Sequence, residues 1–134
     1  MKRRQLLGYA AGTATLALLK PAAAEGYVHF TADVYEQELA SGNPFVLGFL
    51  SSWGPVCRVQ ERTVSALINS KPEYSEIKFI RADWDEFGRS ELTKQLKIPR
   101  RSTLLMYRGG EEVARVIAQT NKDVIEELFV AALQ

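Results

Sequence analysis

The chain has 134 residues, which is enough for one compact domain and too few for two. With 46% apolar and 25% charged residues, its composition is that of an ordinary globular protein and excludes fibrous, low-complexity and repeat classes. The formal net charge of +1 gives no sign of a protein built to bind polyanions.

The first 24 residues are predicted to be a secretory signal peptide and not part of the domain. A basic start, MKRRQ, precedes the uncharged run LLGYAAGTATLALL, and Ala22-Ala23-Ala24 supplies a small-residue cleavage site. The uncharged run is short for a membrane span, so an uncleaved membrane anchor is the less favoured alternative. RRQLL resembles the twin-arginine export signal in part, and the general export route stays open. We expect a mature chain that begins near Glu25 and resides in the periplasm or is otherwise exported.

Removal of this segment would change the charge balance. The first 24 residues contain four Lys or Arg and no acid, which leaves 13 basic against 16 acidic residues, a formal charge of −3. This balance argues against nucleic acid as a partner. Contact with a membrane is expected only through the signal segment, if that segment is not cleaved.

Helical and strand patterns alternate from residue 31 onward. Thr31 suits the cap of a helix over residues 32–40. The apolar run FVLGFL, residues 45–50, predicts a strand that is covered on both faces. Pro55 suits the first position of a helix that continues to Asn69. The predicted apolar face of that helix contains Val56, Val59, Thr63, Ala66 and Leu67.

The second half of the chain is predicted to contain two more strands in a hairpin and a final helix. Ser90 can cap a short helix that ends at Leu96, and Arg108-Gly109-Gly110 is typical of a hairpin turn. Thr120, with Asp123 three residues later, resembles a capping box. The remaining predicted elements are strands at 77–82, 102–107 and 112–118 and a helix at 121–133.

This order of elements predicts an α/β domain. Two strands that are connected through a helix imply a parallel crossover pair, and the hairpin adds an antiparallel strand. We expect a mixed four-stranded sheet with helices on both faces.

The stretch SWGPVCR contains Cys57, the one cysteine of the chain. Small exported domains favour disulfides, so a single cysteine is unusual. Cys57 cannot form a disulfide within its own chain. It is either a buried, inert thiol or a reactive thiol that pairs with another molecule.

Two segments resemble the thioredoxin family. FVLGFLSSWGPVC resembles the family's apolar strand, small residues, Trp and Cys-x-x-Cys, and STLLMYRGGEEVARVIAQ resembles the strand, turn and strand that follow its cis-proline. The resemblance extends from about residue 30 to the end. It implies a thioredoxin-like fold for residues 25–134, with disulfide-related work in cell-envelope redox homeostasis.

The chain departs from the family's pattern at three positions. Gly54 stands where the family has its nucleophilic cysteine, and Cys57 stands where it has the resolving cysteine. Ser102 replaces the cis-proline and is expected to follow a trans bond, because a non-proline cis bond is costly. Gly48 replaces a buried acid that assists proton transfer.

A second alignment makes Cys57 the nucleophile and places Gln60 at the resolving position. In that alignment Trp53 would lie four positions before the nucleophile, whereas the two are adjacent in the family. The first alignment is therefore preferred.

The resemblance leaves two functions open. A dithiol oxidoreductase needs two cysteines in one chain, which excludes that activity here. Cys57, as the candidate catalytic thiol, would at most exchange mixed disulfides with partner thiols. Alternatively, the chain is a redox-inactive module that binds extended segments of envelope proteins in a chaperone-like way. Under either function the predicted binding residues are Trp53, Gly54, Pro55, Arg101, Ser102 and Thr103.

Neither a cofactor nor a metal is expected. His29 has no metal-binding partners in the sequence, and Asp83, Asp85 and Glu86 lack the spacing of a calcium loop. Nearby basic residues either add positive potential around Cys57 or form a solvated face; they are Arg58, Arg62, Arg100 and Arg101.

Overall fold

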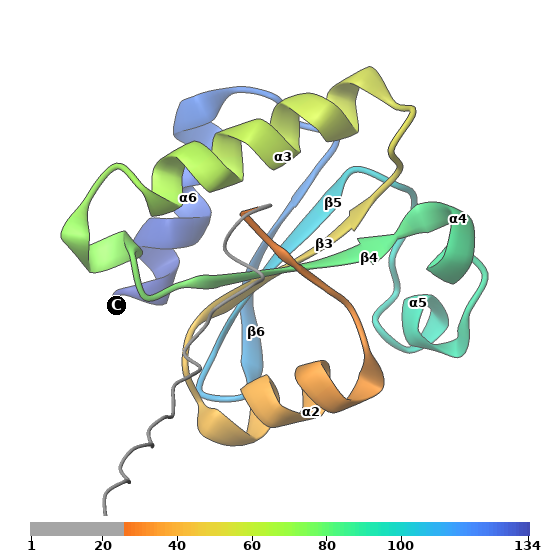
Figure 1. The fold of residues 1–134 in the computed structure, drawn as a ribbon, viewed down its shortest axis with the longest axis horizontal. Helices are drawn as coiled ribbons and strands as arrows, with labels where there is room; N and C mark the ends of the chain where they lie inside the picture. Colours follow the sequence, from red (N-terminus) through yellow and green to blue (C-terminus); the bar gives the residue numbers. More distant parts are fainter. Residues whose placement is uncertain (1–25) are drawn as a thin grey trace, which may run out of the picture.

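The computed structural model describes residues 26–134, so the predicted signal peptide lies outside the described residues. Its centre is a mixed sheet in the order β2-β4-β3-β5-β6 (Figure 1). Strands β2, β4 and β3 are parallel to one another, β5 is antiparallel to β3, and β6 is antiparallel to β5. The strands are β2 Val28–His29, β3 Phe45–Leu50, β4 Lys78–Asp83, β5 Thr103–Arg108 and β6 Glu111–Ile117. The α/β class and the mixed sheet are confirmed.

The sheet has five strands where the sequence predicted four. The additional strand β2 pairs in parallel with Ile80 and Arg81 of β4, and the N–H of Phe30 donates to the carbonyl of Arg81 at 2.8 Å. A strand of two residues is too short to show alternation, so its existence depends on the neighbouring β4, and periodicity alone could not predict it.

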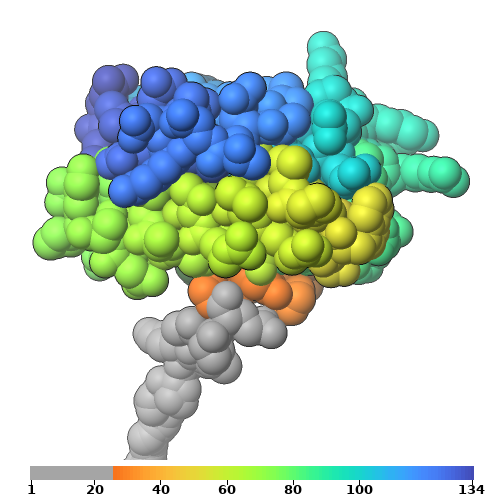
Figure 2. Space-filling model, turned by 90° about the horizontal axis from the view of Figure 1, so that it is seen from above, coloured from red at the N-terminus to blue at the C-terminus, as the bar shows by residue number. Residues whose placement is uncertain are grey.

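Helices cover both faces of the sheet, as predicted. The helix α3 (Pro55–Ile68) and the helix α6 (Lys122–Ala132) cover one face, and α2 (Ala32–Ser41) covers the other (Figure 1). Viewed from above, α3 and the C-terminal region of the chain lie along one another (Figure 2). Among the described residues, no helix is long and apolar enough to cross a membrane.

Two clusters of buried apolar residues lie on opposite faces of the sheet, and β3 contributes side chains to both. All six residues of β3 are buried. Val46 and Leu50 pack with α3 and α6, and the alternate residues pack with α2 and the loops after β4. Period-two alternation thus places apolar groups on both faces, as the continuous apolar run predicted.

Two short helices follow β4, and only the second of them was predicted. The helix α4 (Trp84–Phe87) begins at Asp83, whose carboxylate accepts from the N–H of Asp85, and Ser90 caps α5 (Glu91–Gln95) as predicted. A 3-10 turn, η3 (Pro72–Tyr74), precedes β4. Four residues carry too little periodicity to predict a helix, so α4 is visible only through its cap.

Two details of the predicted helices were wrong. The buried residues of α3 are Cys57, Gln60, Val64 and Leu67, while Ala66 is exposed. Cys57 and Gln60 therefore face the core, where Gln60 makes two hydrogen bonds to backbone carbonyls. In α6 the cap is Asn121 and not Thr120, since the side chain of Asn121 accepts from two backbone N–H groups at 2.8 and 3.2 Å.

The hairpin was predicted correctly. Gly109 and Gly110 join β5 to β6, and both have positive φ, at 64° and 79°. Glycine adopts this conformation without steric cost, which is why Gly-Gly favours a tight turn between strands.

Candidate functional site

The candidate site lies where β3 ends and α3 begins. Gly54 is the N-cap of α3 with an extended backbone, and Pro55 holds the first helical position. The side chain of Trp53, just before them, is 54% exposed. The loop therefore presents one large aromatic side chain to solvent while its next residues enter the helix.

Cys57 is completely buried one turn into α3. Its Sγ lies 2.8 Å from Oγ of Ser102 and accepts from the N–H of Ser51 at 3.3 Å. The hydroxyl of Ser51 lies 3.7 Å from the same sulfur. The thiol is thus held by polar groups of two loops, and no part of it reaches the surface.

Ser102, which contacts Cys57, has a left-handed backbone. The described residues include no cis peptide bond, as expected for a serine here, and φ of Ser102 is +64°. Its N–H donates to the carbonyl of Phe49, and its own carbonyl accepts from the N–H of Ala118, both at 2.8 Å. A left-handed residue other than glycine is uncommon, and these bonds hold it in place.

Gln60 completes this network from α3, one turn after Cys57. Its Nε2 donates to the carbonyl of Ser102 at 3.1 Å and to that of Gln119 at 2.9 Å. Its Oε1 is buried and has no hydrogen-bond partner within the described part of the chain. The sequence analysis considered Gln60 only as a replacement for a resolving cysteine. A polar residue three positions after Cys57 was the available signal for its buried role.

Gly54 faces the sulfur of Cys57. A Cβ at position 54 would lie 3.5 Å from Sγ of Cys57, and 2.8 Å from Oγ of Ser51. This placement supports the alignment in which Gly54 and Cys57 stand at the two motif positions. A side chain at position 54 would require the hydroxyl of Ser51 to turn away.

Gly48 is enclosed by hydrocarbon. A Cβ at Gly48 would lie 3.2 Å from each of three side chains, those of Leu50, Phe79 and Leu104. Each contact is tighter than ordinary van der Waals packing, so a carboxylate could not be added here without repacking. The structure therefore offers no space for a carboxylate side chain at position 48.

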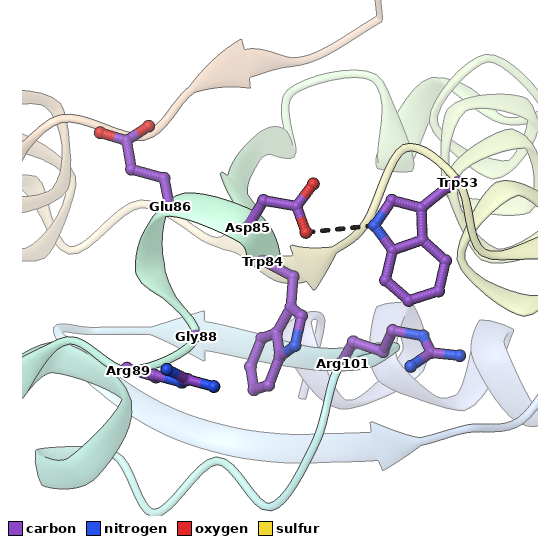
Figure 3. A pocket seen from close by; sticks show the side chains of 7 residues that line it. All are labelled: Trp53, Trp84, Asp85, Glu86, Gly88, Arg89 and Arg101. Atoms are coloured by element: carbon purple, nitrogen blue, oxygen red, sulfur yellow. Dashed lines mark hydrogen bonds between the residues drawn. The ribbon is translucent and has the colours of Figure 1, made fainter.

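An open groove of about 750 Å³ lies beside Trp53. Trp53 donates from Nε1 to Asp85 at 3.1 Å, and the guanidinium of Arg101 lies 4.4 Å from the centre of the indole ring. Asp85 belongs to α4, so this hydrogen bond joins the loop before α3 to α4 across the groove (Figure 3). Its lining residues are Trp53, Trp84, Asp85, Glu86, Gly88, Arg89 and Arg101.

The structure divides the predicted binding residues into two groups. Trp53 and Arg101 line the groove, and Pro55 is exposed nearby. Gly54 is buried, and Ser102 and Thr103 have no exposed area. In this conformation the second group supports the loop and offers no surface to a partner. The sequence analysis did not include Trp84 and Arg89 in the site, because they follow β4 and reach the groove only through the fold.

The chemistry available to this arrangement is limited to one sulfur. A disulfide cycle within the chain requires a second thiol, and the sequence contains none. Across residues 26–134, no three His, Cys, Asp or Glu side chains are grouped so that they could hold a metal ion. What the site offers at its surface is an exposed aromatic ring, two arginines and an open groove.

Comparison with known proteins gives a consistent assignment. The thioredoxin family model matches residues 26–131. Thioredoxin-2 of Saccharomyces cerevisiae is 32% identical over 89 residues, which cover 65% of this chain and 80% of that protein. Thioredoxin H2-2 of Oryza sativa subsp. japonica is 33% identical over 103 residues, or 74% of this chain and 72% of that one.

Solved structures show the same fold. Trxlp from Edwardsiella tarda superposes with a TM-score of 0.66 at 28% identity, covering 75% of this chain and 95% of that chain. A thioredoxin from Trypanosoma brucei brucei gives a TM-score of 0.65 at 18% identity, over 80% of this chain and 90% of that one, a likeness of fold alone.

Proposed function

Because the chain belongs to the thioredoxin family, we propose that it uses this fold to bind segments of other proteins without a dithiol catalytic cycle. One contrast carries the proposal: Cys57 is 0% exposed, whereas Trp53 beside it is 54% exposed and borders an open groove. Exposed aromatic residues next to a groove are typical binding residues, and a buried thiol is out of reach of a partner disulfide in this conformation.

Binding to an unfolded polypeptide tests this proposal. A fluorescently labelled, reduced and alkylated model protein has no disulfide to exchange, so its anisotropy reports binding alone. We expect Trp53→Ala to weaken binding about tenfold or more, the usual effect of removing a central aromatic anchor. Val130→Ala is the matched control, because Val130 is 45% exposed on α6 and does not line the groove. Equal loss in both variants, or no binding by the natural chain, would contradict the proposal.

A monothiol exchange is the second candidate, and the polar groups around Cys57 favour it. Ser51 and Ser102 place an N–H and hydroxyls within reach of Sγ. In this reaction the Cys57 thiolate attacks a partner disulfide, a Cys57–partner disulfide forms, and the partner's other sulfur leaves as a thiolate. The loop of Ser102 would first have to move away from Sγ.

We also propose that the chain is exported to the periplasm or beyond the cytoplasm, with work in cell-envelope redox homeostasis as the family-based expectation. The support is the pattern of residues 1–24, a basic start, an uncharged run and Ala22-Ala23-Ala24. Replacing Arg3 and Arg4 with lysine should block export by the twin-arginine route. Export that is unchanged in this variant would indicate the general route. If the natural sequence itself stayed uncleaved in the cytoplasm, export would be contradicted.

A further inference from the structure

Basic side chains lie near Trp53 although residues 26–134 have a small excess of acidic residues. Residues 26–134 contain 13 Lys or Arg against 15 Asp or Glu. Even so, Arg89 and Arg101 both line the groove, and Arg58 reaches the adjoining loop, where it donates to the carbonyl of Ser52 at 3.5 Å. The groove lining therefore contains two basic side chains, Arg89 and Arg101, together with the acids Asp85 and Glu86.

The two groove arginines, Arg89 and Arg101, differ from Arg81 and Arg115, which the fold holds in ion pairs. Arg81 pairs with Glu61 at 2.9 Å, and Arg115 pairs with Glu112 at 2.6 Å. None of the ion pairs between described residues includes Arg89 or Arg101. Arg101 stacks on Trp53 instead, which orients a planar guanidinium without occupying its N–H groups with a carboxylate.

The acids of the groove do not neutralise these arginines. Asp85 accepts from Nε1 of Trp53 at 3.1 Å, a bond that fixes the indole. The side chain of Glu86 points away from the tryptophans, whereas Arg89 points toward Trp84 (Figure 3). The groove thus combines two aromatic surfaces with two guanidinium groups that make no ion pair with any of residues 26–134.

We propose that this groove binds an acidic, extended segment of a partner protein, with carboxylates on Arg89 and Arg101 and apolar side chains against the two tryptophans. The inference rests on the proposed function and names the chemistry of its ligand. Guanidinium groups recognise carboxylates by paired hydrogen bonds. A volume of about 750 Å³ suits several side chains, and a small inorganic anion would leave the aromatic surfaces unused.

Intrinsic fluorescence measures this binding directly, because both tryptophans of the chain line the groove. The probe is a ten-residue peptide of alternating Glu and Leu, and its comparison is the same peptide with every Glu replaced by Gln. We expect the Glu peptide to bind about fivefold or more tightly than the Gln peptide at low salt, with the preference declining as salt is added. Arg89→Gln and Arg101→Gln should each remove most of the preference.

Arg62→Gln is the matched control, because it makes the same charge change at an exposed position of α3 outside the groove lining. It should leave most of the preference intact. Equal binding of the two peptides would overturn the acidic specificity and leave the proposed function standing. If neither peptide bound, both would be contradicted. If inorganic phosphate bound through Arg89 and Arg101 while the Glu peptide did not, the groove would be a small-anion site and the inference would be wrong.

Discussion

At the scale of single residues, the site depends on the contact between Cys57 and Ser102. Their side chains meet at 2.8 Å in the core, and Gln60 fixes the backbone of Ser102 from the same helix. The trans bond at Ser102 could be predicted from the sequence, because serine rarely tolerates a cis bond. The left-handed backbone of Ser102 and the buried Gln60 could not, because both depend on hydrogen bonds between segments that are distant in the sequence.

Restoring proline at position 102 should therefore harm the protein. Proline fixes φ near −65° and has no N–H, whereas Ser102 has φ of +64° and donates to Phe49. We expect Ser102→Pro to lower the free energy of unfolding by about 3 kcal/mol or more, measured by urea denaturation. Ser102→Gly is the control. Glycine relieves the left-handed strain but loses the contact with Cys57, so its net change should stay within about 1 kcal/mol. A fully stable Ser102→Pro variant would show that this backbone is not required.

At the scale of elements, the start of α3 determines what chemistry is possible. Sequence patterns predicted β3, α3 and the hairpin within one or two residues, because long apolar runs, Pro55 and Gly-Gly are strong local signals. They identified the inward face of α3 only in part, with Leu67 buried as predicted and Ala66 exposed, since apolarity alone cannot identify a buried glutamine such as Gln60. They also did not predict β2 and α4, whose short lengths carry no usable period.

Adding a cysteine at position 54 tests the geometry at the start of this helix. A Cβ there would lie 3.5 Å from Sγ of Cys57, so Gly54→Cys should form an intrachain disulfide after mild oxidation. Mass spectrometry should show the loss of two hydrogens. Disulfide reductase activity should rise above background but stay weak, because Gly48 is packed against hydrocarbon and provides no acid. Cys57→Ser combined with Gly54→Cys is the control for activity from one thiol. Two unpaired thiols in the oxidised Gly54→Cys variant would contradict the alignment.

At the scale of the whole molecule, the fold is that of the thioredoxin family. The family and the α/β class could be predicted, since the order of elements and the stretch around Cys57 resemble those of the family. The groove could not, because Trp84 and Arg89 come from a segment that reaches Trp53 only after folding. Two arginines without an ion pair in the described part of the chain make this groove suited to the acidic partner that we propose.

In this account Cys57 belongs to the core, and the groove beside Trp53 is the surface that we propose to be functional. The most direct measurement is the rate at which a small disulfide reagent reacts with the Cys57 thiol. This rate is compared between the folded protein and the chain unfolded in urea, over a range of pH. Because Cys57 is 0% exposed, reaction must await local opening. We predict a rate in the folded protein about a hundredfold or more below that of the unfolded chain, which corresponds to an opening free energy of about 2.7 kcal/mol. A folded-state rate equal to or above the unfolded rate would contradict the claim and would make Cys57 a reactive thiol.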